Sequence, residues 1–102
     1  KKRVTMTIGV TAKIQILAGK NDEFEAIFKQ LVSAVHANEK GCLLYAFYQS
    51  REDAQTYIVL EQYTDDSAFH AHTKTEHYKH FGQAVSSCFA AAPKIELMDS
   101  IE

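Results

Sequence analysis

Four histidines gather in one short segment of the chain, and imidazole is the side chain best suited to moving a proton near neutral pH. They are His70, His72, His77 and His80. His77 and His80 are three residues apart and could face the same way on a helix, where Glu61 or His72 could complete a three-ligand metal site. None of these spacings is specific to a metal, so we expect no metal; His70 and His80 can equally be solvated surface residues.

Glu61 is a carboxylate that the sequence places in apolar surroundings. In a strand it would share one face with Tyr57, Val59 and Tyr63. A buried carboxylate is costly unless something hydrogen-bonds to it, and the candidate partners are a histidine on a helix or a tyrosine hydroxyl. Such a pair could fix a helix on the sheet or take part in catalysis, and the residues alone leave both readings open.

Aromatic side chains could line the space between a sheet and its helices, or the other face of the sheet. They are Tyr45, Phe47, Tyr48, Tyr57, Tyr63, Phe69, Tyr78 and Phe81. Most aromatic residues belong to a core, but several tyrosines that point into one space could hold a flat aromatic substrate and orient it with their hydroxyls. The residues therefore indicate a small-molecule pocket with one carboxylate and one or two histidines nearby.

Other function classes find little support. The chain has no GxGxxG, CxxC or HExxH motif and no serine nucleophile elbow. Eleven basic and thirteen acidic residues give a formal net charge of −2, which favours neither nucleic acid nor an anionic membrane as a partner. No apolar run approaches the ~20 residues of a membrane span. Cys42 and Cys88 have apolar neighbours, which favours free core thiols and a cytoplasmic location.

The first half of the chain changes from a strand pattern to a helix pattern. Residues 7–17 alternate between apolar and polar side chains, which predicts a strand. Apolar residues at helical spacing then predict a helix, with Asn21 or Asp22 as its N-cap and Glu25 reaching back in a capping box. Gly41 is expected to end this helix. Residues 1–5 are expected to form a flexible tail.

The second half predicts a hairpin, two helices and a last strand. Residues 43–49 and 56–63 are strands in which both faces are largely apolar, so one face needs a cover besides the domain's own helices. N-cap residues at 65–67 and at 75 begin two helices, and a strand at 94–101 follows Pro93. The order is the split βαβ pattern of a ferredoxin-like α+β domain that spans residues 1–102, with a four-stranded antiparallel sheet and helices on one face.

Residues 61–78 carry a pattern that resembles the signature of the antibiotic biosynthesis monooxygenase family. The pattern is Glu-x-aromatic at a strand end, a short helix that contains alanine and ends in His, and then Thr-x-His-aromatic. The matching residues are Glu61, Tyr63, Ala68, His72, Thr75, His77 and Tyr78. The resemblance implies a homodimer whose sheets pack together into a shared α/β barrel, which agrees with strands that are apolar on both faces.

The resemblance also implies an activity, which is cofactor-independent oxygenation of a phenol or quinol by O₂. His72 would be the base or proton carrier, and Glu61 would orient it. Substrate-binding residues would be Tyr45, Phe47, Tyr63, Phe69, His77 and Tyr78. No cofactor is expected, because the substrate anion would react with O₂ directly.

Two departures from the family pattern concern the pocket, since Tyr63 stands where Trp is frequent and Glu76 where Pro is common. The chain has no Trp and no Asn in its first strand, which disfavours the haem-degrading branch. Related proteins isomerise a phosphorylated autoinducer sugar, and Lys74 and Lys79 could then bind phosphate. A third possibility is a dimeric small-molecule-binding or stress-response protein without catalysis.

Overall fold

The computed structural model describes residues 7–101, so the tail expected over residues 1–5 lies outside the described part. Its elements follow the predicted order: β1 (Ile8–Gln15), α1 (Asn21–Asn38), β2 (Cys42–Gln49), β3 (Thr56–Tyr63), α2 (Asp66–Thr73), α3 (Glu76–Ser86) and β4 (Lys94–Asp99). The fold class predicted from the sequence, a ferredoxin-like α+β domain, is confirmed.

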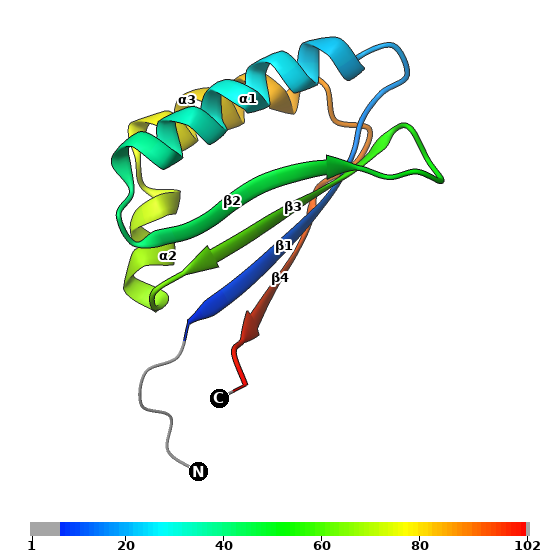
Figure 1. Cartoon of the computed structure of the whole chain (residues 1–102). Helices are drawn as coiled ribbons and strands as arrows, with labels where there is room; N and C mark the ends of the chain where they lie inside the picture. Colours follow the sequence, from blue (N-terminus) through cyan, green and yellow to red (C-terminus); the bar gives the residue numbers. More distant parts are fainter. Residues whose placement is uncertain (1–6, 102) are drawn as a thin grey trace.

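The four strands form one antiparallel sheet in the order β2-β3-β1-β4. Helices α1 and α3 lie side by side over one face of this sheet, and α2 lies at one end of it (Figure 1). The opposite face carries no helix within the described residues. The sheet therefore has one face that the helices cover and one that they leave open.

The apolar side of β1 and the apolar side of α1 pack against each other in the core. In β1, Ile8, Val10, Ala12 and Ile14 are buried, and the residues between them are not. In α1 the buried residues are Phe24, Phe28, Leu31 and Val35, which recur three or four positions apart and so form one face of the helix. The core lies between α1, α3 and the covered face of the sheet.

The start of α1 differs from the capping box that the sequence predicted. The helix begins at Asn21, and Lys20 occupies the N-cap position without a side-chain cap. The Asn21 amide instead donates to the Ala54 carbonyl at 2.8 Å and to the Tyr57 hydroxyl at 3.0 Å, while Glu25 accepts a hydrogen bond from Tyr57. Asn21 and Glu25, which local sequence rules assign to a capping box, therefore form hydrogen bonds with residues distant in the sequence.

The end of α1 also differs, since the helix stops at Asn38 and Gly41 is not its terminal glycine. Gly41 does not have a positive φ; within the described residues Gly19 alone does, at 84°. The reason for glycine at position 41 is space, because a Cβ there would lie 2.7 Å from the Cβ of Ala68 in α2. The other two caps are confirmed: Asp65 accepts from the Ala68 amide and Thr75 from the Tyr78 amide.

The open face of the sheet is apolar over β2 and β3, as the sequence predicted. Leu44 is 43% exposed and Tyr48 is 61% exposed. Their cross-strand neighbours on β3 include Ile58, and Leu60 lies opposite Ala46. Such an apolar face is unusual for a surface that stays in contact with water.

Two further features concern the chain as a whole. Cys42 and Cys88 are both free thiols, and Cys88 is buried, as expected. Among residues 7–101, no helix has the length and the apolar character needed to cross a membrane.

The close approach at Gly41 makes a stability prediction. Gly41→Ala should lower the free energy of unfolding by about 1–3 kcal/mol, because the new methyl group collides with Ala68. Gly9→Ala is the matched control, since its Cβ would make only ordinary van der Waals contacts with Met98, none closer than 3.6 Å. Urea denaturation measures both. A Gly41→Ala/Ala68→Gly double variant should recover part of the loss, and additive effects would contradict this explanation.

Candidate functional site

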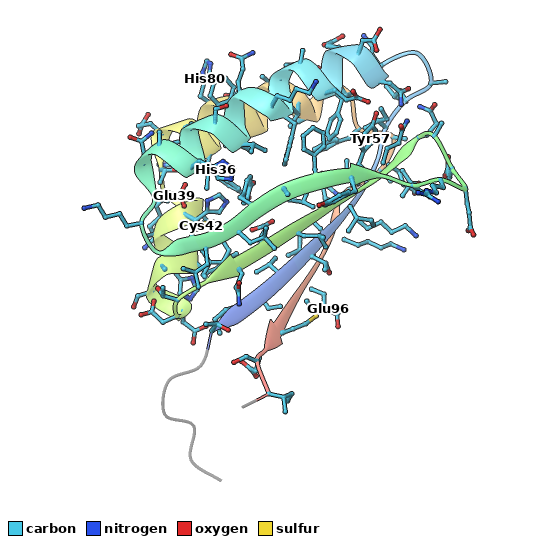
Figure 2. All side chains as sticks on the ribbon, in the orientation of Figure 1. His36, Glu39, Cys42, Tyr57, His80 and Glu96 are labelled. Atoms are coloured by element: carbon cyan, nitrogen blue, oxygen red, sulfur yellow. The ribbon has the colours of Figure 1, made fainter. Side chains whose placement is uncertain are left out.

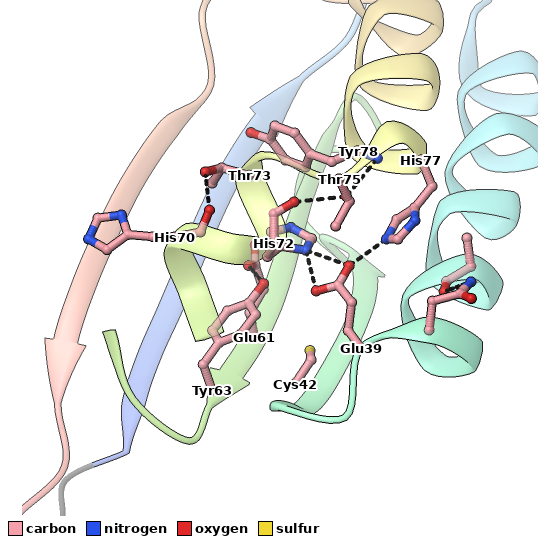
Figure 3. Close-up of polar contacts among 12 residues, drawn as sticks. Glu39, Cys42, Glu61, Tyr63, His70, His72, Thr73, Thr75, His77 and Tyr78 are labelled. Atoms are coloured by element: carbon pink, nitrogen blue, oxygen red, sulfur yellow. Dashed lines mark hydrogen bonds and ion pairs between the residues drawn. The ribbon is translucent and has the colours of Figure 1, made fainter. Parts of the chain in front are cut away.

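A single carboxylate, Glu39, joins two imidazoles where three helices meet (Figure 3). Glu39 is the C-cap of α1, His72 lies in α2 and His77 lies in the first turn of α3. The His72 Nδ1 atom lies 2.9 and 3.0 Å from the two carboxylate oxygens, and His77 Nε2 bonds one of these oxygens. An ionised carboxylate only accepts hydrogen bonds, so both rings donate to it.

The contact with Glu39 fixes the tautomer of the His72 imidazole. The side chain is 2% exposed, and burial lowers its pKa, although Glu39 acts in the opposite direction. The neutral ring carries its proton on Nδ1, which faces Glu39, and Nε2 is left as an acceptor. The rings of Tyr45, Tyr63 and Tyr78 surround it, with centroids 5.1, 5.4 and 4.9 Å away.

Glu61 forms a separate acidic pair with Tyr63. The Tyr63 hydroxyl donates to Glu61 Oε1 at 2.6 Å. Burial raises the pKa of the Glu61 carboxyl to about 7; the Tyr63 hydrogen bond opposes this rise, and the negative charge of Glu39 adds to it. Glu61 therefore exchanges a proton near neutral pH, as a general base or acid must.

A cavity of about 270 Å³ opens between the covered face of the sheet and α3, and Glu61 lines it. Its walls are mostly apolar and include Ile14, Phe28, Leu31, Val59, Val85 and Phe89. Tyr45 and Tyr78 line the same cavity, and burial followed by the charge of Glu61 raises the pKa of both phenols. The cavity thus presents one titrating carboxyl and two neutral hydroxyls on an apolar wall.

The structure separates the residues that the sequence grouped into one site. Tyr45, Glu61 and Tyr78 line the cavity, whereas the other five predicted residues do not. Those five are Phe47, Tyr63, Phe69, His72 and His77. His72 and Tyr63 lie behind the cavity wall through their contacts with Tyr45, Tyr78 and Glu61.

The remaining three predicted residues have structural contacts. Phe47 packs in the core against Phe28, with ring centroids 4.8 Å apart. Phe69 packs on Tyr63 at 5.4 Å, and His77 bonds Glu39. Packing therefore accounts for Phe47 and Phe69, and the hydrogen bond to Glu39 accounts for the position of His77.

The expected Glu61–His72 pair does not form. His72 bonds Glu39, and Glu61 bonds the Tyr63 hydroxyl, which was the other partner proposed for it. Glu39 is the residue that sequence reasoning missed. It follows the last helical residue of α1 and has no motif around it, so that only the tertiary approach of α2 and α3 reveals its role.

Two of the other histidines, His70 and His80, are peripheral. His70 and His80 are exposed, in agreement with a solvated surface reading, and His80 lies on the outer side of the helix layer (Figure 2). Figure 2 also shows Glu39 and Cys42 at one end of the helix–sheet interface and Tyr57 at the other. Within residues 7–101 no three histidine, cysteine or acidic side chains are arranged to hold a metal ion.

These features define a class of protein: a ferredoxin-like α+β domain with an apolar cavity that is lined by one carboxyl whose pKa is raised to about 7. Residues 7–84 match the family model described as "Antibiotic biosynthesis monooxygenase". The chain belongs to the antibiotic biosynthesis monooxygenase family.

Solved structures agree with this assignment. A Caulobacter crescentus protein that bears the same family name is 38% identical, with a TM-score of 0.93 over 96% of this chain and 92% of that one. A conserved protein of Methanosarcina mazei is 28% identical, with a TM-score of 0.86 over 91% of both chains. A Pseudomonas aeruginosa protein is 26% identical, with a TM-score of 0.86 over 99% of this chain and all of that one. A search of curated proteins finds no match.

The bridge at Glu39 makes a second stability prediction. Glu39→Ala leaves two imidazole N–H groups without their acceptor, and we expect a loss of about 2–4 kcal/mol in the free energy of unfolding. Glu39→Gln keeps one acceptor oxygen and should cost less. Urea denaturation at pH 7 measures both, with the exposed Glu52→Ala in the β2–β3 turn as control. An Ala variant at position 39 no less stable than this control would contradict the bridge.

Proposed function

We propose that this chain is a monooxygenase that oxidises a small phenol or hydroquinone with O₂, and that Glu61 takes up the phenolic proton. The observation that carries the proposal is a partly buried carboxyl, with its pKa raised to about 7, that lines an apolar cavity beside Tyr45 and Tyr78. Membership of the family supports oxygenation as the class of reaction. The two neutral phenols supply hydrogen bonds that orient a substrate hydroxyl toward Glu61.

The reaction balances without a further reductant. Ionised Glu61 accepts the proton of a substrate hydroxyl, and the electron-rich anion gives its electrons to O₂. A C–O bond forms at a ring carbon that carries hydrogen. The O–O bond then breaks, so that one oxygen atom stays on the ring and the other leaves as water. For a naphthohydroquinone the products are a hydroxynaphthoquinone and one water molecule.

His72, the base that the resemblance suggested, takes a different role in this proposal. It does not line the cavity, and its Nδ1 proton is committed to Glu39. Its ring packs against Tyr45 and Tyr78, the two phenols that face the cavity. We therefore treat His72 as a positioning residue and Glu61 as the catalytic base.

The apolar cavity favours oxygenation over the isomerase alternative. A phosphorylated sugar needs many polar partners, whereas nine of the fifteen cavity residues have aliphatic or aromatic hydrocarbon side chains. Of the two lysines suggested for phosphate, Lys79 lines the cavity and Lys74 does not. Binding without turnover is the remaining alternative, and an activity measurement separates it.

The activity prediction uses ¹⁸O₂ and 1,4-naphthohydroquinone. The protein should form hydroxynaphthoquinone that carries one ¹⁸O atom, a product that uncatalysed oxidation to the unlabelled quinone does not give. Glu61→Gln should lower this rate by about 10²–10⁴-fold, because it removes the base. The rate should rise with pH through about 7, since Glu61 acts as a base only when ionised.

The exposed Glu23→Gln is the matched carboxylate control and should keep full activity. The titration of Glu61 also has a readout without substrate. A carboxyl pKa that is raised in the folded state lowers stability as pH rises from about 4.5 to about 7. Glu61→Gln should remove this decline in urea denaturation. A Glu61→Gln variant with undiminished labelled product would refute the assignment of the base.

We further propose that a second copy of the chain covers the open sheet face. Leu44 and Tyr48 expose apolar surface there, and Ile58 and Leu60 continue it on the next strand. Burying such a patch against an identical patch gives a closed two-fold dimer, with each sheet covering the other.

The dimer prediction is tested by sedimentation. Wild type should sediment as a dimer at micromolar concentration, and Leu44→Asp/Tyr48→Asp as a monomer with unchanged circular dichroism, because two charges enter the apolar contact. Leu17→Asp is the control, since Leu17 is similarly exposed but follows β1 and lies off the sheet. A folded double variant that remains dimeric would place the interface elsewhere.

A further inference from the structure

One face of α3 forms a wall of the cavity. Tyr78, Lys79, Gly82, Gln83 and Val85 all line it, at the spacings that place residues on one side of a helix. The ligand must therefore contact this face of α3, and the side chains on it restrict what can enter. Two of these residues, Gly82 and Lys79, are not explained by the reaction chemistry.

Gly82 is an unfavourable residue for its position. It lies inside α3, where glycine is among the least favourable residues for helix formation. Neither backbone geometry nor packing requires it: its φ is not positive, and an added Cβ would meet nothing within 4 Å. This contrasts with Gly41, where a Cβ would collide with Ala68. The missing side chain at position 82 leaves open space at the cavity wall.

Lys79 brings a positive charge to the same wall, one turn before Gly82. Its side chain is exposed, and it forms no ion pair with any residue between positions 7 and 101. It is the one cation among the residues that line the cavity, and Glu61 is the one carboxyl. Because Glu61 is mostly buried and Lys79 is exposed, the carboxyl lies inside and the ammonium lies at the mouth.

Cavity size restricts the ligand further. A volume of about 270 Å³ lies just below the roughly 300–1,000 Å³ of pockets that enclose drug-sized molecules. The cavity therefore suits one ring or two fused rings better than a larger polycycle. The polar groups at its two ends suit a molecule with a hydroxyl at one end and an anionic group at the other.

We propose that the ligand is a one- or two-ring phenol that carries a carboxylate, with the ring against Gly82 and the carboxylate at Lys79. This inference rests on the proposed function, because it places the phenolic hydroxyl at Glu61. Gly82 then acts as a specificity-determining residue, since any side chain there occupies the space of the ring. Lys79 selects an anionic substituent over a hydrogen at the same ring position.

The experiment compares two fluorescent probes, 6-hydroxy-2-naphthoate and 2-naphthol, which differ by the carboxylate alone. The chain has no tryptophan, so probe fluorescence can be excited with little protein background. Wild type should bind the naphthoate at least tenfold more tightly than the naphthol. Lys79→Gln should make the two affinities equal, whereas Lys29→Gln, the same change on the outer face of α1, should keep the preference.

Gly82 is tested with the same probes. Gly82→Leu should weaken the binding of both probes at least tenfold, while Ala84→Leu, on the exposed side of α3, should change neither. Gly82→Ala should raise the melting temperature by about 4–8 °C, because helix propensity improves, and should still weaken binding. A stabilised variant that binds less well shows that the glycine serves the ligand and not the fold.

The outcomes separate this inference from the proposed reaction. Equal affinity of wild type for the two probes, no binding of either, or unchanged binding by Gly82→Leu would each overturn the inference. If the naphthoate binds as expected but no ¹⁸O-labelled product forms from naphthohydroquinone, the proposed function fails and the ligand class stands. If labelled product forms and Lys79→Gln leaves the probe preference intact, the reaction stands and the inference fails.

Discussion

The carboxylate of Glu39 is the contact on which the arrangement of this domain depends. It accepts hydrogen bonds from His72 in α2 and His77 in α3, so one side chain at the end of α1 positions the two helices that follow β3. Both imidazoles donate to it through a ring N–H, and burial favours the neutral form of His72 by lowering its pKa. Tyr45, Tyr63 and Tyr78 pack around the fixed His72 ring, and two of them face the cavity. The geometry of the cavity thus follows from a bond outside it.

Two acidic groups in one small domain have different environments and consequently different chemistry. Glu39 has two N–H donors, which satisfy its charge. Glu61 has one hydroxyl donor and apolar neighbours, so burial, with a smaller contribution from the charge of Glu39, raises its pKa to about 7. The contact that positions the helices therefore also favours the protonated form of the carboxyl that lines the cavity. Removing Glu39 would alter both the packing and the proton affinity of Glu61.

Sequence patterns predicted the fold because local and long-range preferences agree there. Alternation in β1, the apolar face of α1 and the caps at Asp65 and Thr75 all appear in the structure. The site was predicted only in part. Strand alternation correctly turned Glu61 toward Tyr57, Val59 and the helices, but it cannot tell which helix end approaches. The hydrogen-bond partner of His72 is Glu39, thirty-three residues away, and the periodicity of a sequence cannot predict such a contact. The roles of Gly41 and Gly82 depend on what lies opposite each glycine, which is also a tertiary property.

Several positions in this chain reduce stability in places where a ligand or a second chain would use them. A partly buried carboxyl, a glycine inside α3 and an apolar sheet face in water are each unfavourable for an isolated domain. They are not scattered, because Glu61 in β3 and Gly82 in α3 line the same cavity. A sequence that only had to fold would place an apolar side chain at position 61 and alanine at position 82. The loss of stability at both positions has a common explanation if a ligand fills the cavity and exchanges a proton with Glu61. We therefore assign function to this cavity and not to the exposed histidines.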